Sequence, residues 1–127
     1  MNPELSRLTK GKYLLVTTFR RDGTPVPTPV WMGRDGDDVI VWTRSDAGKV
    51  KRIRNNAVVE LSECDARGRP RGSAVQATAR ILGATESEYG RTLLKRKYGL
   101  TGRISIGASE RFRGRTESLC LAISLDG

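Results

Sequence analysis

Residues 12–31 read KYLLVTTFRRDGTPVPTPVW, and this stretch contains the local signals that decide the fold. Its first part, Lys12 to Arg20, is rich in β-branched and aromatic residues and is apolar on both faces, which predicts a buried strand. Asp22-Gly23 predicts a tight hairpin turn. The second part, Pro25 to Gly33, begins with three prolines at alternate positions, which a strand tolerates only where the missing N–H groups point away from its partner. The stretch therefore predicts a hairpin whose second strand lies at a sheet edge or barrel rim.

Further strands and short helices are predicted along the rest of the chain. The expected strands are Asp38 to Thr43, Ala57 to Asp65, Ser73 to Gly83 and Thr116 to Leu125. The expected helices are Asn2 to Lys10, a segment from Ser45 or Asp46 to Asn55, and a segment from the capping box Thr85-Glu86-Ser87-Glu88 to about Tyr98. The first three strands should form a meander, and the last strand should bury one face. The third helix should bury Tyr89, Leu93 and Leu94. About six antiparallel strands with two or three short helices predict a mostly β protein, a small barrel forming one domain over residues 1–127.

The composition limits the chemistry that this chain can perform. The 127 residues have a formal charge of +9 and include no histidine. The absence of histidine excludes Ser-His-Asp and Cys-His nucleophilic sites and most transition-metal sites. Cys64 and Cys120 form no Cys-x-x-Cys pair, so we expect two buried, reduced thiols. An enzyme of this composition would depend on a cofactor, and a large ligand would sit on the rim or between subunits because the interior of so small a domain is limited.

The sequence gives no indication of a membrane span or of a signal peptide. No window approaches the length of an apolar membrane span, and the first residues lack a signal-peptide pattern. We therefore expect a soluble, cytoplasmic protein with no membrane contact.

Leu100 to Gly114 is basic and predicts no particular element, and we expect it to contribute to a substrate pocket.

The stretch from Ser45 to Arg54, SDAGKVKRIR, is the strongest candidate site. It places four cations near the start of a helix, where the helix dipole disfavours positive charge. Free N–H groups of the first turn, close backbone approach at Gly48, and the side chains of Lys49 and Lys51 together suit a phosphate group. The alternative is a solvated basic face on an ordinary amphipathic helix. The phosphate of a nucleotide-like cofactor and that of a nucleic acid fit this pattern equally well.

Two other groups of residues are weaker candidates. Trp31 and Trp42 lie on neighbouring expected strands and are candidates for a platform under a flat ring, although core packing is the commoner role of tryptophan. Arg67, Arg69 and Arg71 would share one face of an extended segment. These arginines suit a solvated turn, a nucleic-acid contact or a clamp for carboxylates.

Several of these motifs together resemble a known family. The motifs are the run from Lys12 to Phe19, the run from Asp22 to Trp31, Val41-Trp42-Thr43, the run from Gly48 to Arg54, and Cys64-Asp65-Ala66-Arg67-Gly68. In this order they resemble the pyridoxamine 5'-phosphate oxidase-like flavin and deazaflavin oxidoreductases, and in particular the actinobacterial branch that uses the deazaflavin coenzyme F420. The resemblance covers nearly the whole chain. It implies a split β-barrel of the FMN-binding type that forms a homodimer, with cofactor grooves at the subunit interface.

The resemblance also implies roles for individual residues. Lys49 and Lys51, with the Ala47-Gly48 backbone, match the family's phosphate-binding segment, and Trp42 and Thr43 match the strand end that leads into it. The remaining matches are Val30, Trp31 and Met32, whose backbone would run beside the flavin or deazaflavin ring, and Arg52 and Arg71, weaker matches that would favour a polyglutamate tail. The expected reaction is hydride transfer between coenzyme F420 and an activated double bond of a small-molecule substrate, with no catalytic side chain assigned.

Three alternatives remain open from the sequence. An FMN-binding oxidoreductase of the same fold would use the same phosphate site but would leave the general basicity unexplained. A basic β-barrel that binds single-stranded nucleic acid would stack bases on Tyr13, Trp31 and Trp42. Against that reading, only 6% of the residues are aromatic and both tryptophans lie in apolar strands, so we expect no nucleic-acid partner. The third alternative is a cofactor carrier or storage protein without turnover.

Overall fold

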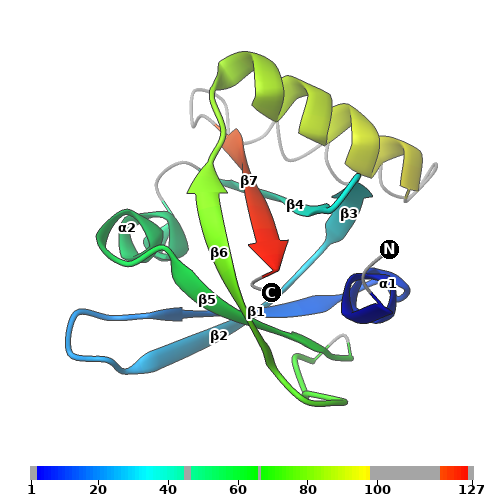
Figure 1. Cartoon of the computed structure of the whole chain (residues 1–127). Coiled ribbons are helices and arrows are strands. Elements are labelled where there is room, and N and C mark those ends of the chain that lie inside the picture. The colour runs from blue at the N-terminus through cyan, green and yellow to red at the C-terminus, as the bar shows by residue number, and fades with distance from the viewer. Residues whose placement is uncertain (1–2, 45–46, 66, 98–117, 126–127) are drawn as a thin grey trace.

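The computed structural model describes residues 3–44, 47–65, 67–97 and 118–125, which form one curled antiparallel sheet and three helices (Figure 1). The strands are β1 (Leu14–Phe19), β2 (Pro25–Val30), β3 (Met32–Asp35), β4 (Asp38–Arg44), β5 (Val58–Glu63), β6 (Val75–Ile81) and β7 (Ser118–Leu125). The helices are α1 (Pro3–Thr9), α2 (Gly48–Asn55) and a helix at residues 84–97. The sheet order is β2-β1-β5-β6-β7-β4-β3. The predicted class, mostly β with a split-barrel architecture, is confirmed.

The hairpin predicted from residues 12–31 is present, but its second strand ends earlier than expected. Gly23 adopts a φ of 90°, a left-handed conformation that glycine allows at low cost, and its N–H donates to Arg20 O at 2.8 Å. The run from Pro25 to Gly33 is divided at Trp31, which gives seven strands instead of six among the described residues. The predicted meander is nevertheless present, because β1 pairs antiparallel with β2 and β3 pairs antiparallel with β4. β2 and β3 are the two ends of the sheet order, and only Trp31 separates them in the chain, so the curl of the sheet brings these two edges together.

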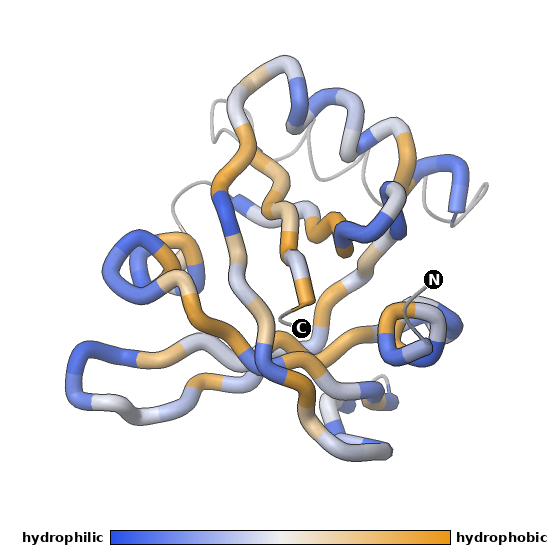
Figure 2. The backbone as a smooth tube through the Cα atoms, in the orientation of Figure 1, coloured by the Kyte–Doolittle hydropathy of each residue, from blue (hydrophilic) through white to orange (hydrophobic). Residues whose placement is uncertain are grey.

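The main core lies inside the curl of the sheet. It contains Leu5 and Leu8 of α1 together with inward residues of the strands, including Leu14, Val16, Val41, Leu61, Leu121 and Ile123. Apolar residues lie along the strands, whereas the β1–β2 turn at the left of the view is hydrophilic (Figure 2). Burial of this apolar face is the main stabilising contribution to the fold.

β7 is buried on both faces, so the expectation of a single buried face is wrong. Leu121 and Ile123 face the main core, whereas Cys120 and Ala122 pack into a second cluster with Ile40 and Leu82. The helix at residues 84–97 covers that second face, at the top of the view (Figure 1). Its position explains why the small residues of β7, which alternate with the large ones, are also buried.

The third helix begins differently from the predicted capping box. It starts at residue 84, and the N–H of Ser87 donates to Gly83 O at 2.8 Å, so Thr85 lies inside the helix and is not its cap. The Ser87 side chain is buried and bonds to Leu82 O and to the N–H of Cys120. Leu94 is buried and Leu93 half-buried as expected, but Tyr89 is 58% exposed, so its predicted burial is wrong. Packing on β7 selects the face of Ser87 and Leu94 instead.

Candidate functional site

The start of α2 is unusually positive for a helix N-terminus. Ala47 is the N-cap residue and makes no side-chain capping bond, and the first turn contains no acidic residue. The predicted caps Ser45 and Asp46 lie outside the described residues, as do Asn2 and the segment Leu100 to Gly114. Four of the eight helix residues are cations, although the dipole at this end favours anions. The local sequence therefore creates a place where a negative group would be stabilised.

Lys49 points back from the helix toward the sheet. Its Nζ lies 3.2 Å from Thr43 Oγ1, near the end of β4, and Thr43 is buried. Burial lowers the pKa of Lys49 below its usual 10.5, and the positive charge of Arg52 lowers this pKa further. An ammonium group in such surroundings gains more from a bound anion than a fully solvated one does.

Arg52 lies about one helical turn after Lys49 and, like Lys49, bonds to a buried threonine. Its Nε donates to Thr18 Oγ1 at 2.6 Å, and Thr18 is a β1 residue with only 1% of its surface exposed. A Cβ at Gly48 would lie 2.8 Å from Arg52 Nη1, so the guanidinium lies against the first residue of the helix. Glycine at this position allows that approach.

Lys49 and Arg52 together form what we call the α2 anion site, with Gly48, Thr18 and Thr43 as its supports. Among the residues that the structure describes, no carboxylate pairs with either cation. β1 and β4 are separated in the sheet by β5, β6 and β7, so α2 reaches both strands because the sheet is curled. Two adjacent cations, half-buried and beside the N-terminus of a helix, suit a phosphate or a similar oxyanion.

The other basic residues of α2 lie elsewhere. Lys51 and Arg54 are exposed, and residues 49 and 51 are about 200° apart around a helix with 3.6 residues per turn. The buried face of α2 is formed by Val50 and Ile53. The structure therefore brings Lys49 and Arg52 together and leaves Lys51 facing solvent in the protomer.

The residues expected beside a cofactor ring are dispersed between core and surface. The side chains of Val30 and Met32 belong to the main core, which leaves their backbone as the part that a ring would meet. Trp31 and Trp42 are half-buried, and Trp42 packs against the cluster of Ile40 and Cys120. The pairing of Met32 with Val41 places the two tryptophans at the next position of the β3–β4 ladder.

The Arg67, Arg69 and Arg71 group forms a turn and not an extended face. The N–H groups of Arg67 and Arg69 both donate to Asp65 Oδ1, and Gly68 adopts a φ of 84°. Arg71 is exposed, and its N–H donates to Glu63 O, at the opposite end of β5 from α2. Arg71 is therefore distant from Lys49 within one protomer.

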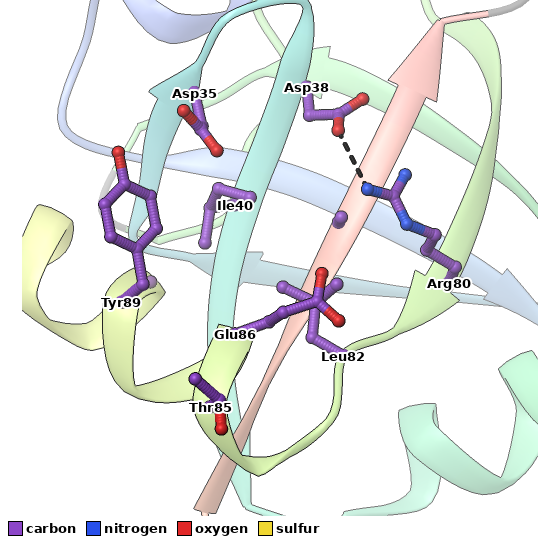
Figure 3. A pocket seen from close by; sticks show the side chains of 10 residues that line it. Asp35, Asp38, Ile40, Arg80, Leu82, Thr85, Glu86 and Tyr89 are labelled. Carbon is purple, nitrogen blue, oxygen red and sulfur yellow. Dashed lines mark hydrogen bonds and ion pairs between the residues drawn. The ribbon is translucent and has the colours of Figure 1, made fainter.

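A separate pocket of about 210 Å³ lies between the β3–β4 turn, β6 and the first turns of the 84–97 helix (Figure 3). Its lining includes Ile40 and Leu82, with the ion pair of Asp38 and Arg80 at its edge, 3.1 Å apart. Tyr89 also lines it. None of the predicted site residues lies in this pocket.

Thr18 is the site residue that sequence reasoning missed. It follows Leu14 and Val16 at alternate positions of β1, and all three are buried. A hydroxyl at a buried position of an otherwise apolar strand face can be recognised in the sequence. It indicates a binding partner, because a buried polar group requires one. The partner itself, Arg52, is 34 residues away and could not be identified from local sequence.

Neither thiol nor carboxylate groups offer a further centre in the described residues. Both cysteines are free; Cys120 is buried as expected, and Cys64 is only half-buried. Burial raises the pKa of the Cys120 thiol to about 11. Within the described ranges no cluster of three His, Cys, Asp or Glu side chains could hold a metal ion, and no helix has the length and apolar character needed to cross a membrane.

Solved structures of other proteins have the same fold as this chain. A conserved hypothetical protein from Mycobacterium tuberculosis is 16% identical with a TM-score of 0.72, and the match covers 100% of this chain and 82% of that one. A protein named F420 Reductase is also 16% identical, with a TM-score of 0.62 and coverage of 100% and 97%. HutZ, the haem storage protein from Vibrio cholerae, is 14% identical, with a TM-score of 0.68 and coverage of 99% and 90%.

Sequence comparison assigns the family. No curated protein matches the chain. The family model described as pyridoxamine 5'-phosphate oxidase matches residues 2–123, nearly the whole chain and all the elements that build the α2 anion site. The chain therefore belongs to the pyridoxamine 5'-phosphate oxidase family.

Proposed function

We propose that this protein is an oxidoreductase that binds a phosphate-bearing flavin or deazaflavin at the start of α2. The observation that carries the proposal is the α2 anion site, where Lys49 and Arg52 lie together, half-buried, with no carboxylate partner among the described residues. Half-buried cations without counter-ions are costly, and a bound phosphate would remove that cost. Family membership makes a cofactor of this kind the natural ligand.

The specific cofactor that we propose is coenzyme F420. The chain has 23 basic and 14 acidic residues, so its field attracts a ligand with several negative charges. A tail of carboxylates would use this excess of positive charge, whereas FMN ends at its phosphate. The structural likeness to a protein named F420 Reductase supports the same choice.

A homodimer is part of this proposal. Arg71 and the α2 anion site lie at opposite ends of β5, whose first and last residues are about 17 Å apart at about 3.3 Å per residue. Arg71 would meet the same cofactor most directly from a second subunit, in a groove between two copies. A groove between subunits also answers the shortage of interior space in a domain of this size.

The side chains of this protein would bind and orient rather than react. Lys49 and Arg52 would hold the phosphate, and the backbone of Val30, Trp31 and Met32 would border the ring. When bound, the deazaflavin supplies the hydride that is exchanged with an activated double bond of a small substrate. Exclusion of water and alignment of the two rings would be the contribution of the protein, and solvent would provide the proton.

Two rival ligands are separated by particular observations. FMN is the second candidate, because the α2 anion site would bind its phosphate equally well. Haem, which the similar protein HutZ stores, is less well served, because this chain has no histidine with which to ligate haem iron.

The test is a titration of the intrinsic fluorescence of Trp31 and Trp42 with coenzyme F420, with FMN and with a short single-stranded oligonucleotide. We expect tight binding of F420, weaker binding of FMN and none of the oligonucleotide. Preference for FMN would keep the phosphate site and change the cofactor. Binding of the oligonucleotide alone would overturn the proposal.

A further inference from the structure

Thr18 has a hydroxyl in a place where an apolar side chain would be expected. It continues the buried face of β1 formed by Leu14 and Val16, and only 1% of its surface is exposed. Burying a hydroxyl is unfavourable unless it is hydrogen-bonded. Its partner in this structure is Arg52 Nε, at 2.6 Å, which is a short distance for a bond between a guanidinium and a neutral oxygen.

The bond to Thr18 uses only part of the donor capacity of Arg52. A guanidinium has five N–H donors in a fixed plane, and binding through Nε leaves the two terminal nitrogens for a ligand. One of them, Nη1, lies so close to Gly48 that a Cβ there would be 2.8 Å away. The terminal nitrogens are therefore held beside the first residue of α2, where the helix N–H groups also begin.

Without a restraint, Arg52 would not be expected to stay there. Lys49 and Arg52 repel each other, as the contribution of Arg52 to the lowered pKa of Lys49 indicates. A long arginine side chain in the first turns of a helix also gains rotational freedom and hydration by extending into solvent. The bond to Thr18, on a strand that is paired on both sides, opposes both tendencies.

We infer that Thr18 is a positioning residue for phosphate binding: its hydroxyl holds Arg52 over the start of α2, so that a phosphate group meets two cations already in place. The inference rests on the proposed function and adds to it a residue to which the family resemblance assigned no role. A site assembled before binding loses less conformational entropy when the ligand arrives, so Thr18 contributes affinity without touching the ligand.

The test compares four variants of the full chain: Thr18→Val, Thr18→Ser, Arg52→Met and the double variant Thr18→Val/Arg52→Met. Valine keeps the shape of threonine and removes the hydroxyl, whereas serine keeps the hydroxyl. The probes are inorganic phosphate and FMN, with affinities measured by calorimetry. We expect Thr18→Val to weaken both probes about three- to tenfold, the range for one lost hydrogen bond, and Thr18→Ser to remain within about twofold of the original protein.

The double variant shows whether Thr18 acts through Arg52. If it does, the double variant should bind no more weakly than Arg52→Met alone, because the Thr18 hydroxyl has no effect on affinity once Arg52 is absent. Additive losses would mean that Thr18 affects binding by another route, and would overturn the inference.

A second measurement needs no ligand. The Arg52 Nε–H group should give a distinct, slowly exchanging NMR signal in the original protein and in Thr18→Ser, and this signal should move to the solvated range in Thr18→Val. An unchanged signal in Thr18→Val would show that the hydroxyl does not hold Arg52.

The outcomes separate this inference from the proposed function. If Lys49→Ala weakens phosphate and FMN while Thr18→Val binds as well as the original protein, the positioning role is overturned and the cofactor site stands. If the original protein binds no phosphate, FMN or coenzyme F420, both are overturned.

Discussion

α2 and the helix at residues 84–97 cover the same sheet, yet their polar groups are used in opposite ways. In the 84–97 helix, the Ser87 hydroxyl donates to Leu82 O and accepts from the N–H of Cys120. In α2, Lys49 and Arg52 each bond to one threonine and retain further donors. The hydroxyl of Ser87 both donates and accepts a hydrogen bond within the protein, whereas Lys49 and Arg52 keep N–H donors that these bonds do not use.

This difference suits the 84–97 helix to a structural role, and it is the reason that we propose a binding role for α2. Ser87 and Gly90 bring the 84–97 helix close to β7 and fix its position. At Gly48 a missing Cβ instead makes room for a guanidinium. Glycine thus allows close helix packing in one region and the close approach of a guanidinium in the other, and substitutions at the two should have different effects.

The largest effect should follow Gly90→Val. A Cβ at Gly90 would lie 2.8 Å from Cys120 Sγ and 2.9 Å from Ile40 Cγ2, and valine adds two methyl groups beyond it. We expect the free energy of unfolding to fall by about 3 kcal/mol, the upper range for overpacking, as measured by urea denaturation. Gly11→Val is the control, because a Cβ there meets nothing within 4 Å. Equal stability of the two variants would show that the helix is not seated closely on β7.

The next largest effect should follow Lys49→Ala, which removes one of the two cations of the α2 anion site. Affinity for coenzyme F420 or FMN should weaken by about 1 to 3 kcal/mol, as expected for a charge-assisted contact. Lys51→Ala, on the exposed side of the same helix, is the matched control and should cost much less. Equal losses would mean that general positive charge, and not the geometry of the site, attracts the cofactor.

The pH dependence of phosphate affinity should be smaller but diagnostic. Burial and Arg52 lower the pKa of Lys49, so Lys49 loses its charge, and affinity falls, as the pH rises through a midpoint below 10.5. Arg52→Met should move this midpoint upward. In the ligand-free protein the sign is reversed: the unfolded chain holds the proton more tightly, so the free energy of unfolding rises over the same interval. A midpoint that does not change in Arg52→Met would show that Arg52 does not influence the protonation of Lys49.

The smallest effect should follow Gly48→Ala. The new methyl group would push against Arg52 Nη1, the end of a flexible side chain, so the fold should tolerate it. Alanine also favours helix more than glycine does. We expect unchanged or slightly higher stability together with about two- to threefold weaker phosphate binding, the size of a partly lost contact. Lower stability would place Gly48 in the same structural role as Gly90.

The same comparison explains which predictions from sequence were confirmed. The Asp22-Gly23 turn and the end of α2 before Asn56 depend on local chemistry, and both are present. The Thr85 capping box and the burial of Tyr89 also used local signals, but packing on β7 overrode them. The break of the second strand at Trp31 was not predicted, because it depends on how the whole sheet curls and not on neighbouring residues.

Most strand positions, the proline-rich edge, the basic start of α2 and the family resemblance could be recognised from neighbouring residues. Which cations of α2 lie together depends on the folded chain. Lys51 was a stronger candidate than Arg52 in the sequence, but the curl of the sheet brings Thr18 of β1 and Thr43 of β4 to the same face of α2. That face holds Lys49 and Arg52, since burial of Val50 and Ile53 fixes the rotation of the helix.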